Sequence, residues 1–287
     1  MPVRLPTVAG MFYPARATAC RAEVEECLRS ATPREFPRPI RGGVVPHAGW
    51  TYSGRTAAHV FAAIAERETP ETLVLFGAVH RWGVERAALY GVGSWRTPLG
   101  DISIDSDLAA RVLALGDGLL VDQPRAHDEE HSIEVQLPFV RHLFPQSRIL
   151  PIAIPPEVQA ERVGRIVAQA VTELGLGAIA VGSSDLTHYG PRYGLAPAGA
   201  GEPGWRWARA NDARLLELAV KMQAGEVLRE AATRYNACGA GAIAAAIGYA
   251  SALGATEGVL LEYTTSYDVH PNGRPGDLVG YGALVFC

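Results

Sequence analysis

An apolar run ends abruptly in the stretch Val44-Val45-Pro46-His47-Ala48-Gly49-Trp50. A Pro-His pair followed by glycine is typical of a buried strand that delivers a side chain to the rim of a sheet and then turns away. If Val44 and Val45 lie in a parallel strand, His47 sits just beyond its carboxyl end, where open α/β sheets bind their ligands. His47 is therefore the first candidate for chemistry in this chain.

The same pattern occurs twice more along the chain. Residues 73–79 lead into His80, and residues 178–182 lead into Ser183-Ser184-Asp185-Leu186-Thr187-His188. Because the carboxyl ends of parallel strands meet at one edge, we expect these side chains to converge there. Helical patterns between the strands predict an α/β fold with a central mixed, largely parallel sheet flanked by helices. Without an internal repeat or a linker, residues 1–287 are expected to form a single domain.

Composition narrows the class of protein. The 287 residues are 48% hydrophobic, enough for a substantial core, and carry a net charge of -4. Basic clusters are absent from the sequence, so nucleic acid is not an expected partner. The N-terminus has no apolar signal core, which predicts a cytoplasmic protein. The charge-free segment 235–256 is rich in Ala and Gly, which favours a packed interior helix over a membrane span.

Hydrophobic periodicity predicts the elements around the three strand ends. Helices are expected over residues 18–29, 54–66, 106–115, 133–144, 158–174, 205–232 and 240–253. Ser53 is the expected cap of the second helix, and Pro138 is expected to kink the fourth. Residues 258–267 and 278–286 are expected to close the chain as antiparallel strands.

Two neutral imidazoles and one anionic ligand are the smallest set that holds a divalent metal and leaves positions open. His47 and His80 supply the imidazoles, and either Asp185 or the thiolate of Cys238 supplies the anion. Cys238 lies where the Ala-rich helix begins, so the helix dipole is expected to lower the pKa of its thiol. The alternative is that Cys238 is a small buried residue at a tight helix start. All four cysteines are expected to be reduced, since none forms a CxxC pair.

Asp185 and His188 are three residues apart after the third strand. A carboxylate beside an imidazole suits a general acid or base, or an outer contact that tunes a metal. The alternative is that Asp185 caps the following turn and His188 is partly exposed.

A rival motif, His127-Asp128-Glu129-Glu130-His131, matches the HxxEH pattern of zinc peptidases. In that pattern two helical histidines hold zinc and the glutamate activates water. Three consecutive acids and the nearby Pro124 favour a loop and a helix start over the middle of a helix. We therefore expect His131 to point into the cleft at the strand ends instead.

Five motifs resemble, in this order, the Memo family. They are AGMFYP at residues 9–14, PHAGWTYSG at 46–54, EHSIEVQLP at 130–138, Ser183-Ser184-Asp185 with His188, and Cys238-Gly239. The resemblance spans nearly the whole chain. Bacterial and archaeal members are often labelled protein B of the AmmeMemoRadiSam system. The family is similar in fold to class III extradiol ring-cleaving dioxygenases, whose non-haem iron is held by two His and a Glu.

The resemblance implies a metal set and three catalytic residues beside it: His47, His80 and Cys238 for the metal, with Asp185, His188 and His131 next to them. A cysteine stands where the ring-cleaving enzymes have glutamate. Arg81 follows His80, where the family often has a second histidine.

The expected function is that of a metal-dependent, dioxygenase-like oxidoreductase. The expected metal is iron or copper, with zinc as the alternative, because soft sulfur disfavours magnesium and calcium. The alternative functions are a non-catalytic protein that binds a small molecule or peptide in the cleft, and a zinc hydrolase. The resemblance also implies association with AMMECR1-like and radical SAM partner proteins.

Overall fold

The computed structural model describes residues 2–32, 34–36, 38–157 and 159–287, and within these residues nine strands form one sheet. Its order is β10-β12-β2-β9-β3-β8-β4-β7, with β11 also paired to β12. The strands are β2 (Gly42–Val45), β3 (Thr72–Gly77), β4 (Ala87–Leu89), β7 (Leu120–Asp122), β8 (Arg148–Ala153), β9 (Ala178–Ser183), β10 (His188–Tyr189), β11 (Gly258–Thr265) and β12 (Leu278–Phe286).

The centre of this sheet is parallel. Strands β2, β9, β3 and β8 run in the same direction, and β4 and β12 pair antiparallel with its outer members. The predicted α/β class with a mixed sheet is therefore confirmed. The closing pair β11–β12 is antiparallel, as expected.

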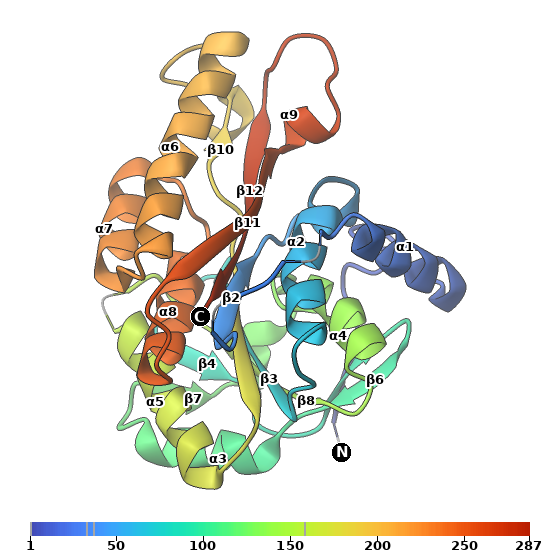
Figure 1. Cartoon of the computed structure of the whole chain (residues 1–287), viewed down its shortest axis with the longest axis vertical. Helices are drawn as coiled ribbons and strands as arrows, with labels where there is room; N and C mark the ends of the chain where they lie inside the picture. Colours follow the sequence, from blue (N-terminus) through green and yellow to red (C-terminus); the bar gives the residue numbers. More distant parts are fainter. Residues whose placement is uncertain (1, 33, 37, 158) are drawn as a thin grey trace.

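Helices cover both faces of the sheet (Figure 1). They are α1 (Ala17–Arg29), α2 (Trp50–Ala65), α3 (Ser106–Leu115), α4 (Leu137–Leu143), α5 (Ala160–Leu174), α6 (Glu202–Val220), α7 (Ala224–Arg234), α8 (Ala240–Ala252) and α9 (Ser266–Val269). Neighbouring strand residues point to opposite faces, so Val74 joins the core with α5 and α8 while Leu75 joins the core with α1, α2 and α4. Because both faces are covered, the central strands are apolar except at their end residues, such as Thr72, Arg148 and Ser183.

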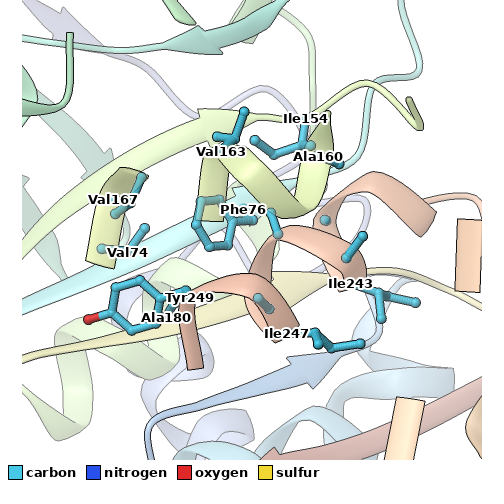
Figure 2. Packing of buried hydrophobic residues seen from close by; sticks show 14 of the residues in the cluster. Val74, Phe76, Ile154, Ala160, Val163, Val167, Ala180, Ile243, Ile247 and Tyr249 are labelled. Atoms are coloured by element: carbon cyan, nitrogen blue, oxygen red, sulfur yellow. The ribbon is translucent and has the colours of Figure 1, made fainter. Parts of the chain in front are cut away.

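The Ala-rich helix α8 is an interior helix, as predicted. Figure 2 shows Ile243, Ile247 and Tyr249 of α8 in the same buried cluster as Val163 and Val167 of α5. Glycines let the two backbones approach: a Cβ at Gly164 would lie 1.9 Å from the carbonyl oxygen of Ala245. In the part of the chain that the structure describes, no helix combines the length and apolarity that a membrane span requires.

Replacing Gly164 with alanine is expected to lower the free energy of unfolding by about 3 kcal/mol, because the added methyl group forces α5 away from α8. Chemical denaturation would measure the change. Gly225→Ala in α7 is the matched control, since its new Cβ would meet only Arg229, at 3.9 Å. Equal stabilities for the two variants would contradict the close packing of the helices.

The predicted start of the second helix is wrong. The helix α2 begins at Trp50 and its N-cap position is Gly49. Ser53 is therefore not the cap; it lies inside the helix and its hydroxyl donates to the carbonyl of Ala48 at 2.8 Å. The earlier start buries the Trp50 side chain against Phe139.

Two other predicted elements need correction. The single helix expected over residues 205–232 is divided into α6 and α7, because Met222 adopts a left-handed backbone conformation between them. Pro138 does not kink a helix. It occupies the first turn of α4, where its missing N–H is not needed, after a short 3-10 helix at Glu134–Gln136. The predicted start at Val158 lies outside the described residues, and α5 begins at Ala160.

Candidate metal centre

Three neighbouring strands deliver polar side chains to one edge of the sheet. Strand β9 lies between β2 and β3, and Val45 of β2 is in register with Ser183 of β9. His47 follows β2, His80 follows β3 and Asp185 follows β9. The predicted convergence of the strand ends is therefore observed.

Three histidines meet at this edge. Among the described residues, His47, His80 and His131 each offer a ligand atom within 4.8 Å of the others. Their ring centroids are 5.1 Å apart for His47 and His80, 5.4 Å for His47 and His131, and 5.0 Å for His80 and His131. His131, expected only beside the metal set, is thus a member of the histidine cluster.

The carboxylate of Glu130 holds His80 in place. It accepts hydrogen bonds from the backbone N–H of His80 at 2.9 Å and of Ser132 at 2.9 Å, and lies 3.1 Å from Nδ1 of His80. Burial acts to raise the pKa of Glu130, but the bonds and charge of His80 outweigh it and keep that pKa below its usual value. For His80, burial acts to lower the pKa, but the same carboxylate raises it overall. The pair fixes the ring so that Nε2 remains available to a metal.

Asp185 fixes the turn that carries His47. One of its oxygens accepts the backbone N–H of His47 at 2.7 Å and that of Ala48 at 3.2 Å. Burial raises the pKa of Asp185. Burial also lowers the pKa of His47 well below its usual value, and the charges of His80 and His131 lower it further. His47 is therefore a neutral imidazole at neutral pH, which is the form that binds metals.

Cys238 lies against His47 without belonging to the histidine cluster. Its Sγ is 3.1 Å from Nε2 of His47 and 3.6 Å from the carbonyl oxygen of Asp185. The expected lowering of its pKa is wrong: burial and the charge of Asp185 raise the pKa of the thiol. The role of Cys238 as a metal ligand stays a prediction. All four cysteines lie in the described part of the chain and are free, as expected.

His188 lies at the side of the centre, near the Asp185 carboxylate. Its Nε2 is 4.0 Å from Oδ2 of Asp185 and has no hydrogen-bond partner among the described residues. Burial lowers the pKa of this imidazole. Together with Tyr193, Tyr235 and Cys238, His188 lines an open cleft of about 530 Å³.

The HxxEH motif does not form a zinc-peptidase site. Residues Pro124–His127 form a 3-10 helix, and no helix continues through His131. His127 is buried and bonds through Nε2 to the carbonyl oxygen of Ala88 at 2.9 Å, outside the histidine cluster. His131 lies instead in the histidine cluster at the strand ends, and its expected position in a cleft stays a prediction.

Two supporting residues were missed by the sequence reasoning. In the sequence motifs Glu130 has a role only as the glutamate of the HxxEH pattern, and Ser183 has no role of its own. Ser183 in fact lies 3.0 Å from Nδ1 of His47. The sequence signal for both residues was their position. Glu130 directly precedes His131, and Ser183 ends β9 directly before Ser184 and Asp185.

Replacing Glu130 with glutamine is expected to weaken metal binding about 10- to 100-fold, because the new amide cannot accept every hydrogen bond that orients His80. Competition with a chromophoric chelator would measure the affinity. Glu129→Gln serves as control, because the Glu129 side chain is 79% exposed. An unchanged affinity in Glu130→Gln would show that the carboxylate does not support the metal site.

Comparison with known proteins identifies the family of this chain. A structure titled "Crystal structure of uncharacterized protein JW3007 from Escherichia coli K12" shares the fold, with a TM-score of 0.52 and 11% identity over 86% of this chain and 99% of that one. A "MEMO1 family protein" of Thermococcus onnurineus is 40% identical over 99% of both chains. One of Pyrococcus abyssi is 39% identical over 99% of both. The family model described as "Memo-like protein" matches residues 4–285, and the chain therefore belongs to the Memo-like protein family.

Proposed function

We propose that this protein is a metal-dependent oxidoreductase that uses iron or copper. The observation that carries the proposal is the cluster of His47, His80 and His131, with ligand atoms within 4.8 Å of one another. Imidazole nitrogens suit iron, copper and zinc, whereas magnesium and calcium prefer oxygen ligands. The sulfur of Cys238 beside His47 strengthens the preference for soft, redox-active metals.

The donor atoms fit such an ion. Nδ1 of His80 faces Glu130 and Nδ1 of His47 faces Ser183, so both rings have Nε2 left for a metal. Three protein ligands would leave further coordination positions of the ion open, as catalytic metal sites require. A bound iron or copper ion would supply one-electron transfer and chemistry with oxygen.

The chain's own residues supply the remaining functions. The open cleft beside Cys238 has the size of a small-molecule site and includes the apolar side chains of Leu186 and Leu195. His188 lines that cleft, and because its Nε2 is buried near Asp185, Nδ1 is the ring nitrogen that could accept or donate a proton at a ligand there. Asp185 would stabilise the protonated form of His188.

Metal analysis of protein purified without an affinity tag tests the proposal. We expect about one iron or copper per chain, followed by oxygen uptake when a panel of small redox-active phenols and thiols is supplied. Zinc as the bound metal would instead favour hydrolysis, since three histidines are also a catalytic zinc set. A metal-loaded protein that binds panel members without consuming oxygen would point to ligand binding alone. Either outcome would overturn the proposal that the protein is an oxidoreductase.

Metal binding is expected to release one more proton from the wild-type protein than from Cys238→Ser. The raised pKa keeps the thiol protonated until the metal replaces that proton. Calorimetry in buffers with different ionisation enthalpies measures the count. Cys287→Ser is the control, because Cys287 is also a buried free thiol but lies at the end of β12. Equal counts for wild type and Cys238→Ser would show that the sulfur is not a ligand.

A further inference from the structure

Ser183 has a hydrogen-bonding pattern that determines what it can offer His47. Its hydroxyl donates to the carbonyl oxygen of Ser132 at 2.7 Å. A hydroxyl has one proton, so toward any other neighbour Ser183 can act only as an acceptor. Nδ1 of His47 is such a neighbour, at 3.0 Å.

The neutral ring of His47 therefore carries its proton on Nδ1. An imidazole with a protonated Nδ1 has its lone pair on Nε2. Nε2 is the atom that faces Cys238 at 3.1 Å. The opposite tautomer would place two lone pairs, on Nδ1 and on Oγ, against each other, or would force Ser183 to abandon the Ser132 carbonyl. That carbonyl would then exchange its 2.7 Å bond from Ser183 for the longer contact, 3.4 Å, with Nε2 of Gln136 alone.

Gln136 holds this arrangement together. Its Nε2 lies 2.8 Å from the carbonyl oxygen of Pro46, 3.3 Å from Oγ of Ser183 and 3.4 Å from the carbonyl oxygen of Ser132. All three neighbours accept hydrogen bonds, so the amide must present its NH₂ group to them. The side chain is 1% exposed. It thus connects the residue before His47 to the hydroxyl that faces the ring.

We propose that Ser183 and Gln136 are positioning residues that lock His47 in the tautomer with an unprotonated Nε2, the atom that a metal would take. The inference rests on the proposed function for the use of this tautomer, which is to bind a metal. The tautomer itself can be measured in protein from which any metal has been removed. The two supports of the centre differ in charge: the carboxylate of Glu130 faces His80, whereas a neutral hydroxyl and amide serve His47. His47 is consequently the ligand whose Nδ1 faces a neutral partner, the Ser183 hydroxyl.

The test is long-range proton–nitrogen correlation NMR on the metal-free protein, with the His47 signals assigned by their loss in His47→Gln. We expect one tautomer in the wild type, with the proton on Nδ1, and both tautomers in Ser183→Ala. Ser183→Ala should also bind Zn²⁺ or Fe²⁺ about 10-fold more weakly. Ser147→Ala is the control, because the buried Ser147 hydroxyl also donates to a carbonyl, that of Pro70, away from the centre.

The outcomes separate this inference from the proposed function. A proton on Nε2 in the wild type overturns the inference, as does a Ser183→Ala spectrum that keeps a single Nδ1 tautomer. The wild-type measurement decides the matter even if Ser183→Ala does not fold. A wild-type protein that shows the expected tautomer but binds neither iron nor copper would overturn the proposed function and leave the inferred tautomer standing.

Discussion

Replacing Glu134 with alanine is expected to lower the free energy of unfolding by about 3–5 kcal/mol, because it leaves a buried guanidinium without its counterion. The carboxylate of Glu134 is paired with Arg4 at 2.8 Å, and the two side chains are 1% and 4% exposed. It also accepts hydrogen bonds from the backbone N–H groups of Thr7 and Val8 and from the hydroxyl of Tyr13. Chemical denaturation at neutral pH would measure the loss.

The same substitution is expected to disturb the metal centre. Arg4 also donates to the carbonyl oxygens of His127 at 3.0 Å and Glu130 at 2.7 Å, and so anchors the segment that presents His131. Glu129→Ala is the control, since its exposed carboxylate has only a surface ion pair with Arg81 and should change stability by less than about 0.5 kcal/mol. A loss in Glu134→Ala no larger than in this control would refute the buried ion pair as a stabilising contact.

The Glu134 contribution should also depend on pH. Burial acts to raise the pKa of Glu134, but the hydrogen bonds from Val8 and Thr7 and the charge of Arg4 outweigh it and lower that pKa. A lowered pKa in the folded state stabilises the protein above the ordinary value of 4.5, and this stabilisation is lost as the pH falls through the folded-state value. The difference in the free energy of unfolding between wild type and Glu134→Ala should therefore become smaller in acid.

Replacing His47 with alanine is expected to weaken metal binding by more than about 100-fold, the upper end of what removing an outer partner costs, because it removes a ligand itself. His47 is the member of the cluster that also contacts Cys238, so its loss disrupts either possible donor set. Chelator competition on tag-free protein would measure the affinity.

Two further variants make the His47 result specific. His142→Ala, a change in α4 outside the cluster, should bind metal as the wild type does. His131→Ala should weaken binding strongly if the three histidines are the ligands, and far less if Cys238 completes the set. Wild-type metal affinity in His47→Ala would show that the metal binds elsewhere and that the histidine cluster is not the metal centre.

Much of this fold can be predicted from short segments of the sequence. A strand buried on both faces needs a continuous apolar run, and such runs before His47, His80 and Asp185 identified the three strand ends that meet. Helix boundaries were less predictable. Trp50 was assigned to the turn, because local pattern does not show that its indole packs against Phe139 from another helix.

The association with AMMECR1-like and radical SAM proteins, the cytoplasmic location and the single domain over residues 1–287 stay predictions. The Memo resemblance itself is confirmed over residues 4–285.

Local patterns in the chain thus identified the histidines at the strand ends, because a strand buried on both faces is encoded by a run of neighbouring apolar residues. They also placed Cys238 just before α8, which begins at Ala240 as expected. The third imidazole, the carboxylate on His80 and the hydroxyl on His47 depended on how the segment 127–136 folds back over the sheet edge. That path is held by Arg4, whose partners lie more than a hundred positions away along the chain. Contacts of such separation are set by burial and charge pairing in three dimensions, and no periodicity in the sequence records them.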